Sequence, residues 1–538
     1  MEKVIYFLIL IGISISCSDD LLDLKPLDAI SESSVFSDEK LLIDYVNGCY
    51  NAIPDQFRSR QWLDGYSDNG YNTHNMGAWS YTRGQITADN GEDATYNAWS
   101  TGYSNIRKIN IFFTSIESST VKDEIKDRLK GEMEFIRAYI YARLLWFYGG
   151  VPIIEELFDM NSDFSIARNT YDEVAQYIVD ELDAAVQLLP ESYGSDDVGR
   201  ATKGAALALK SRVLLYSASK LNNTTNDLAK WQKAADAAKA VIDLDIYSLH
   251  NDYAGVFLDI TEETIWARFY SKAYGHTLNF NLNLNGYGGG GWYIPTQSLV
   301  DAYETKDGIP VLLDDGTVNP ASGYDLQNPF VNRDPRFYAT IFYNGFLWKG
   351  RGVETFEGGL DTPTGPTPWN ASKSGYYIRK WLHEEVPINE SEIVTNPYSF
   401  FRLAEIYLNY AEALIELGGH DDEAKLYINK VRNRAGMPDI AETGSDLKKR
   451  CYNERRIELA YENHRFFDIL RWEIAEVVLS KNAMGVRIIK NPDNSLTYQY
   501  DRVAEERTFI TTKQYRMPIP RSEITKSKGS LEQNPGYN

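Results

Sequence analysis

Apolar side chains recur at intervals of three and four residues along most of this chain, and that period most constrains its fold. Side chains at this spacing share one face of an α-helix. We therefore interpret each stripe as the core-facing side of a helix and predict a mainly α fold. The clearest stripes are Met133, Ile136, Ile140, Leu144 and Phe147; Tyr171, Val174, Ile178, Leu182, Ala185 and Leu189; and Leu403, Tyr407, Tyr410, Leu414 and Leu417.

Several of the predicted helices come in pairs joined by short polar loops. Helices over 202–219 and 231–242 form one pair, and helices over 401–417 and 423–434 form another, with Gly418 as a C-cap. Hairpin units of about 34–40 residues with small residues at packing positions resemble degenerate tetratricopeptide repeats. We expect a scaffold of stacked helical hairpins.

The composition and periodicity of the sequence change between about 251 and 396. Helical periodicity fades, and Gly and Pro cluster in the runs GYGGGGW and GGLDTPTGPTPWN. Such composition is typical of loops and short strands. We expect a helical scaffold over 35–250 and 397–480, an irregular ligand-binding lobe over 251–396, and a C-terminal wrap over 481–538.

The first residues have the pattern of an export signal. The apolar run Val4–Ile15 is shorter than the roughly 20 residues that span a membrane. Ser16 and Cys17 follow it and fit cleavage by a lipoprotein signal peptidase. We interpret 1–16 as a signal peptide, Cys17 as the lipidated residue and 17–34 as anchor and tether. The alternative is an ordinary secretory signal beside a coincidental cysteine.

The segment NERRIELAYENHRFFDILRW, at 453–472, mixes many charges with aromatic rings. Buried charges are costly unless paired, so the segment indicates either an internal ion-pair network or a polar catalytic site. We predict the network, with pairing between residues in adjacent helical turns. The cations are Arg455, Arg456 and Arg465, and the carboxylates are Glu454, Glu458, Glu462 and Asp468.

This segment resembles the signature near the C-terminus of the SusD/RagB family, where it is structural. That family consists of surface lipoproteins of Bacteroidota that capture nutrients, usually glycans, for an outer-membrane transporter. IPTQSLVDAYETKDG, NRDPRFYATI and the ending QNPGYN also resemble the family. The resemblance implies a helical scaffold, a lipid anchor on the cell surface and a SusC-like TonB-dependent transporter as partner. The Ser-Asp-Asp after Cys17 is similar to the acidic sorting flag of such lipoproteins.

The net charge and the absence of common catalytic motifs argue against several classes of function. The net charge of −21 argues against nucleic-acid binding, which needs a basic face. The sequence has no HExxH, CxxC, GxSxG or phosphate-loop motif. We therefore predict a binding protein without catalytic activity, metal or cofactor. The chain has 76 Asp and Glu residues, but no sequence pattern identifies two of them as the carboxylate pair of a glycoside hydrolase.

Aromatic residues in polar loops are the candidate ligand site, and 37 Tyr and 11 Trp exceed what a core needs. A pyranose stacks its C–H face on a flat ring and hydrogen-bonds its hydroxyls to neighbouring polar groups. In the family the glycan site is an aromatic arc built from an early loop and the irregular lobe. We choose Trp79 and Trp292 as platforms, each of which could instead pack its own loop onto the scaffold. The neighbouring candidates are Trp62, Tyr287, Tyr293, Arg83 and Asp68, and a cluster around Trp348 and Trp369 is the alternative.

The predicted function is capture of oligosaccharides at the cell surface and their delivery to the transporter. One alternative is capture of oligopeptides, as in RagB-like members of the family. Another, of a different class, is a surface glycoside hydrolase. Trp and Tyr beside amide side chains favour sugar over peptide.

Overall fold

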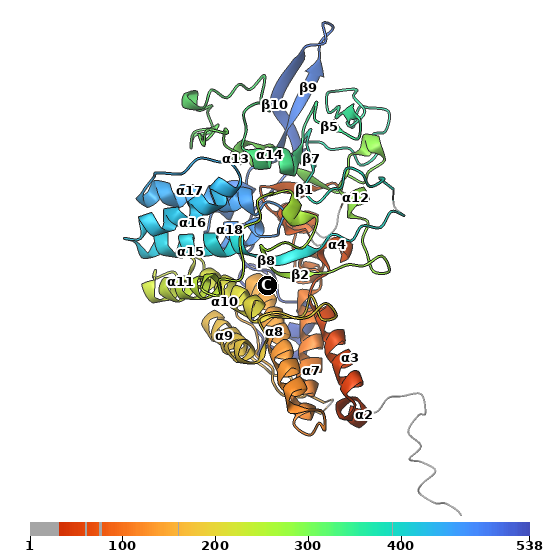
Figure 1. Cartoon of the computed structure of the whole chain (residues 1–538), viewed down its shortest axis with the longest axis vertical. Helices are drawn as coiled ribbons and strands as arrows, with labels where there is room; N and C mark the ends of the chain where they lie inside the picture. Colours follow the sequence, from red (N-terminus) through yellow and green to blue (C-terminus); the bar gives the residue numbers. More distant parts are fainter. Residues whose placement is uncertain (1–31, 60–61, 75–77, 160, 390, 538) are drawn as a thin grey trace, which may run out of the picture.

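The computed structural model describes residues 32–59, 62–74, 78–159, 161–389 and 391–537 (Figure 1). The predicted signal peptide, Cys17 and most of the tether lie outside the described residues. Among the described residues, no helix combines the length and apolar character needed to cross a membrane.

Long helices form the scaffold, as the apolar stripes predict. Their bounds are α3 (Glu39–Cys49), α7 (Ala98–Ile116), α8 (Asp123–Tyr148), α9 (Tyr171–Leu188), α10 (Lys203–Ala218), α11 (Leu228–Ile242), α15 (Leu403–Leu417), α16 (Asp421–Arg434) and α17 (Gly444–Glu458). They stack in chain order, with α8 on α9, α9 on α10, α10 on α11, α11 on α15 and α15 on α16. Both predicted pairs are present as neighbouring helices, and the mainly α fold is confirmed.

Local sequence explains where these helices begin and end. Thr202 accepts a hydrogen bond from the backbone N–H of Ala205 at 3.1 Å, which caps α10. Thr170 and Glu173 form a complete capping box at the start of α9. Gly418 follows α15 with a φ of 76°, a conformation that glycine adopts without steric cost.

Shorter helices lie between these or follow them. Their bounds are α2 (Glu32–Ser37), α4 (Gln56–Ser59), α5 (Ala78–Thr82), α6 (Gly91–Thr95), α12 (Leu278–Asn281), α13 (Gln297–Ala302), α14 (Pro335–Thr340), α18 (Arg465–Arg471), α19 (Ala475–Leu479) and α20 (Arg521–Lys526). The segment 453–472 therefore forms the end of α17, a turn and α18.

Strands form five antiparallel pairs among the described residues, and most of these strands lie between 264 and 402. The pairs are β1 (Gly70–Asn72) with β3 (Tyr293–Pro295), β2 (Thr264–Arg268) with β8 (Tyr398–Arg402), β4 (Ile341–Phe342) with β7 (Tyr377–Ile378), β5 (Leu347–Trp348) with β6 (Arg351–Gly352), and β9 (Ala483–Lys490) with β10 (Leu496–Glu505). The β9–β10 hairpin extends from the body at the end opposite α2 and α3 (Figure 1).

The charges of 453–472 are buried and paired, but the expected local pairing is wrong for most of them. Glu458 accepts hydrogen bonds from Arg336 and Arg402, at 2.9 and 2.6 Å, and is also paired with Arg434. Within the segment, Arg455 donates to Asp468 at 3.0 Å. The partners lie far along the chain because burial requires charged groups that surround each side chain in space, and one helix face supplies too few.

Candidate functional site

The β1–β3 pair brings together the two loops that carry the predicted aromatic platforms. Tyr71 lies opposite Ile294 in the register, and Asn72 lies opposite Tyr293. Just beyond the strands, the backbone N–H of Thr73 donates to the carbonyl of Trp292 at 3.0 Å. The loop after β1 and the loop before β3 are therefore joined through the backbone.

A groove of about 1000 Å³ opens beside this junction. Its walls come from three parts of the chain that are distant in sequence, namely 71–74 with 79–85, 363–373 and 503–508. The third segment begins at the end of β10 and continues beyond it. The volume of the groove is at the upper end of the range for small-molecule sites and suits an extended ligand.

Aromatic side chains line one end of the groove. The ring of His74, which lines the groove, lies 6.4 Å from that of Trp369, another lining residue. On its other side, His74 lies 5.5 Å from the half-buried ring of Trp292, which is not among the residues that line the groove. Trp369 is 65% exposed, which leaves a large apolar face in water. An exposed indole at the wall of a groove is available for contact with a flat apolar face of a ligand.

Trp79 is held in place by two contacts. Its Nε1–H donates to the carbonyl of Asn72 at 3.2 Å, and the guanidinium of Arg83 lies 4.3 Å from its ring centroid. Such a cation–π contact orients the guanidinium over one face of the indole. Trp79 and Arg83 therefore form one combined surface on the wall of the groove.

Exposed polar side chains complete the walls. Arg83, Gln85, Lys373 and Glu506 are exposed, and all four line the groove. Within the described ranges, neither Arg83 nor Lys373 takes part in an ion pair. Their donors are therefore available to the hydroxyl or acidic groups of a ligand.

The walls are anchored by buried groups. Glu505 accepts from the guanidinium of Arg507 at 2.9 Å, and Arg507 also donates to the carbonyls of Ser67 and Gly70. The phenol of Tyr71 accepts from the backbone N–H of Lys373 at 2.7 Å, and burial raises the pKa of that phenol to about 12. These bonds connect the three segments that form the groove.

Two of the predicted contact residues lie in the core instead. Trp62 is 1% exposed and Tyr293 is 2% exposed. Their rings lie 5.4 Å apart, and Trp62 also packs against Phe57 and Trp381. Because neither ring presents a face to solvent, we do not place them in the site.

Tyr287 and Asp68 also have internal roles. The guanidinium of Arg351 lies 3.7 Å from the ring centroid of half-buried Tyr287, whose hydroxyl donates to the carbonyl of Trp348. Asp68 is buried and accepts from Arg465. Although burial opposes it, the guanidinium groups of Arg456 and Arg465 lower the pKa of Asp68 below its usual range.

His74 was not among the residues predicted from the sequence, and Trp369 was predicted only as part of the alternative cluster. In that cluster Trp348 is buried, and Trp369 alone reaches the groove. The available signal was the run GGLDTPTGPTPWN, because a Trp among so many glycines and prolines has no helix or strand that could bury it. His74 carried no sequence signal.

Comparison with known proteins decides the family. The sequence profile of the SusD family matches residues 262–537. This chain belongs to the SusD family. A second profile, described as starch-binding associating with outer membrane, matches residues 20–215. The resemblance drawn from the segment 453–472 is thus confirmed.

Individual members of the SusD family agree along almost the whole chain. A SusD-like protein from Bacteroides fragilis has a solved structure with a TM-score of 0.81 and 30% identity, covering 95% of this chain and 100% of that one. The solved structure of a SusD-like carbohydrate binding protein from the same species has a TM-score of 0.77 and 26% identity. It covers 92% of this chain and 99% of that one. SusD-like protein P25 of Formosa agariphila is 24% identical over 88% of this chain and 90% of its own.

Proposed function

We propose that this protein captures oligosaccharides in the groove at the cell surface and delivers them to a SusC-like TonB-dependent transporter. The observation that carries the proposal is the exposed ring of Trp369 beside His74 and the Trp79–Arg83 pair in an open groove. The protein acts by binding, and chemical conversion of the glycan is left to other proteins.

The chemistry of the groove supports a sugar ligand. A pyranose places its C–H face on an aromatic ring and turns its hydroxyl rim toward polar side chains. Trp369 and Trp79, which both line the groove, are the proposed platforms. Arg83, Gln85 and Lys373 are the proposed hydrogen-bonding partners. The name of the Bacteroides fragilis relative, a carbohydrate binding protein, and the starch-binding description of the second profile support the same ligand class.

Location and organisation follow the same proposal. Cys17 carries lipid chains that hold the mature protein at the outer membrane, in keeping with the outer-membrane association in the profile description. Residues 17–34 act as anchor and tether, and 35–250 with 397–480 form the scaffold. Residues 251–396 form the ligand-binding lobe, and 481–538 complete the groove.

A binding experiment tests the groove. Soluble protein beginning at Ser18 is screened against a glycan array, and the best oligosaccharide is titrated by calorimetry. We expect the double variant Trp79→Ala, Trp369→Ala to lose most of the affinity while keeping the parent's circular dichroism spectrum. A folded double variant that binds as tightly as the parent would remove these rings from the site.

The same preparation distinguishes the two alternatives. An oligopeptide library replaces the glycan array to test peptide capture, and chromatography of the glycan after incubation tests hydrolysis. Binding to peptides and to no glycan, or release of shorter sugars, would overturn the proposal.

A further inference from the structure

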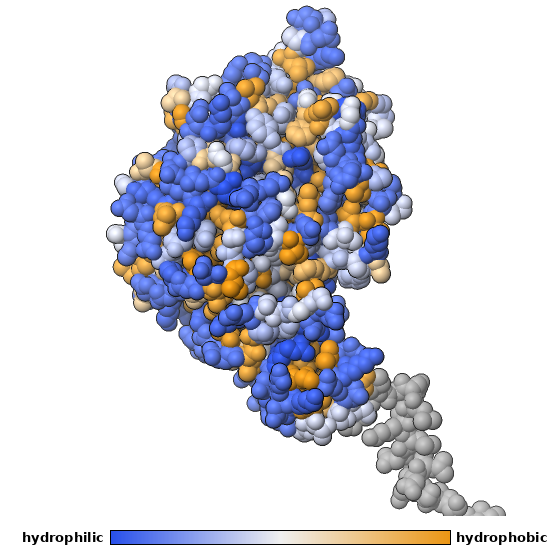
Figure 2. Space-filling view, in the orientation of Figure 1, coloured by the Kyte–Doolittle hydropathy of each residue, from blue (hydrophilic) through white to orange (hydrophobic). Residues whose placement is uncertain are grey.

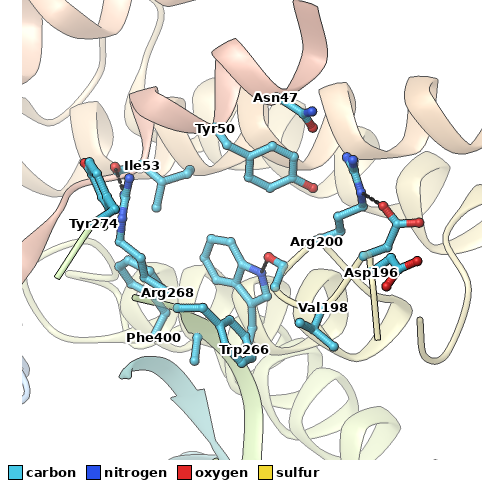
Figure 3. Close-up of a pocket in the computed structure, with 14 residues that line it drawn as sticks. Asn47, Tyr50, Ile53, Asp196, Val198, Arg200, Trp266, Arg268, Tyr274 and Phe400 are labelled. Carbon is cyan, nitrogen blue, oxygen red and sulfur yellow. Dashed lines mark hydrogen bonds and ion pairs between the residues drawn. The ribbon is translucent and has the colours of Figure 1, made fainter. Parts of the chain in front are cut away.

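Exposed aromatic rings gather at more than one hollow of this molecule. Among the described residues, the exposed Phe, Tyr and Trp side chains are Phe164, Phe269, Tyr274 and Trp369. Trp369 belongs to the groove, whereas Phe269 and Tyr274 both line a separate pocket of about 300 Å³ (Figure 3). Most of the face seen in Figure 2 is hydrophilic, so two such rings at one mouth are an uncommon concentration of apolar surface.

The pocket lies between the scaffold and the irregular lobe. Tyr50, which follows α3, forms one wall, and Trp266 of β2 forms the opposite wall (Figure 3). Val198 closes one side, whereas Arg268 and Tyr274 close the other. No residue that lines the groove also lines this pocket.

Partly buried hydrogen bonds hold the walls in position. The Nε1–H of Trp266 donates to the carbonyl of Gly199 at 3.0 Å, which leaves the indole to present carbon atoms. The guanidinium of Arg268 donates to the carbonyl of Ile53 at 2.8 Å. The hydroxyl of Tyr50 donates to Glu132 at 2.9 Å and accepts from the N–H of Ala201 at 2.8 Å. The ring surfaces are therefore preorganised.

The rim offers polar groups of mixed character. Asn47 and Asp196 are exposed, and no described residue bonds to the side-chain amide of Asn47. The guanidinium of Arg200 is already used by Asp197 and Glu132, at 2.5 and 3.0 Å. Amide, carboxylate and guanidinium groups face one pocket without a dominant charge, which suits a neutral ligand that is rich in hydroxyl groups.

We propose that this pocket is a second sugar site, which binds one neutral pyranose or the end unit of a chain, apart from the groove. Its volume is at the lower end of the roughly 300–1000 Å³ of ligand pockets, as expected for a ligand of one ring or two. The choice of a sugar rests on the proposed function, whereas the site itself rests on the geometry of the pocket.

Ligand-observed NMR on a variant that lacks two aromatic rings of the groove tests the second site. The parent, the groove variant Trp79→Ala, Trp369→Ala, and that variant with Val198→Trp added are each mixed with millimolar glucose, galactose, mannose or xylose. Val198 is 53% exposed, so a Trp there fills the pocket without entering the core. Val477→Trp, at a position 62% exposed and outside both sites, is the matched control.

The proposal predicts that saturation transfer to at least one monosaccharide survives in the groove variant. It should persist with Val477→Trp and be lost with Val198→Trp or Asn47→Ala. A silent groove variant, or a signal that Val198→Trp leaves unchanged, would overturn the second site.

Calorimetry with oligosaccharides separates this outcome from the main proposal. Oligosaccharide binding that depends on the groove rings, without any monosaccharide signal from the pocket, would leave the groove function standing alone. A pocket signal in a protein whose groove binds no oligosaccharide would leave the second site standing alone.

Discussion

Arg465 and Asp68 are joined by two hydrogen bonds, at 2.8 and 2.9 Å, although 397 positions separate them in the sequence. Asp68 lies just before β1, the strand that leads into the groove loop. Arg456, from the same C-terminal segment, reaches Asp68 as well, at 3.1 Å. The segment 453–472 therefore contributes to the site by fixing the loop from which the site is built.

The first prediction concerns this pair. Asp68→Ala leaves the buried guanidinium of Arg465 and the partly buried one of Arg456 without their carboxylate, and a broken buried pair costs about 3–5 kcal/mol. We expect urea unfolding, followed by circular dichroism, to show a large loss of stability. The control is Asp89→Ala, because Asp89 forms an exposed pair with Arg521 and such pairs contribute little. Equal midpoints for Asp68→Ala and the parent would contradict this role.

The second prediction is acid sensitivity. Despite burial, facing cations lower the pKa of Asp68, Glu454, Glu458 and Glu462 in the folded protein. Depressed pKa values stabilise the fold above the unfolded values of about 4 and lose that contribution as pH falls through the folded values. The melting temperature should therefore drop steeply below about pH 4. A melting temperature that stays flat from pH 7 to pH 3 would show that the network does not stabilise the fold.

Asp64 gives a prediction of opposite sign. Burial raises its pKa to about 6, against hydrogen bonds from Asn69, Asn463 and Tyr461 that favour the charged form. A raised carboxyl pKa destabilises the fold above the folded value, and protonation relieves that cost between about pH 6 and pH 4. We expect the Asp64 carboxyl to titrate near pH 6 in carbon-detected NMR. A resonance that titrates near pH 4 would contradict the effect of burial.

The fourth prediction isolates the exposed platform. Trp369→Ala should weaken oligosaccharide binding by about 0.5–1.5 kcal/mol, the worth of one aromatic contact beyond simple burial. That corresponds to roughly a 2- to 12-fold rise in Kd by calorimetry. The melting temperature should not change, because the side chain is mostly in water. Phe164→Ala, at another exposed ring outside the groove, is the matched control and should bind like the parent.

The fifth prediction concerns the anchor. Cys17→Ala removes the thiol that would carry the lipid chains, and acyl chains are what hold such a protein to a membrane. The variant should move from the detergent-extracted membrane fraction to the soluble fraction in fractionated cells. A Ser18→Ala variant, which keeps the cysteine, should stay with the membranes. Retention of Cys17→Ala at parental levels would exclude the lipid anchor.

Helices could be predicted from the sequence because their signal is local. The stripe from Tyr171 to Leu189 lies within one stretch of chain, and α9 (Tyr171–Leu188) forms there. Long-range charge pairing could not be predicted in this way. Glu458 has several arginines nearby in sequence, yet its partners include Arg336 and Arg402 because tertiary packing places them around it.

The aromatic residues show the same limit. Trp62 and Trp79 both stand in polar stretches, and local sequence does not distinguish them. Trp62 is buried because Phe57 and the distant Trp381 surround it, whereas Trp79 stays half-buried at the groove. The exposure of each ring depends on which distant segments pack against it. Contacts of this kind, such as the pairing of β1 with β3, form only in the folded chain.

The three-segment construction of the groove has an evolutionary and practical consequence. Its most exposed platform stands on the long loop between β6 and β7, whereas the ion-pair network that anchors the molecule stands on other elements. The same loop carries the buried Asp361, which pairs with Arg351, so substitutions confined to 363–370 can change the groove wall without disturbing that buried charge. Exchange of 363–370 between relatives is therefore a direct way to change the proposed ligand preference while Asp361 stays in place.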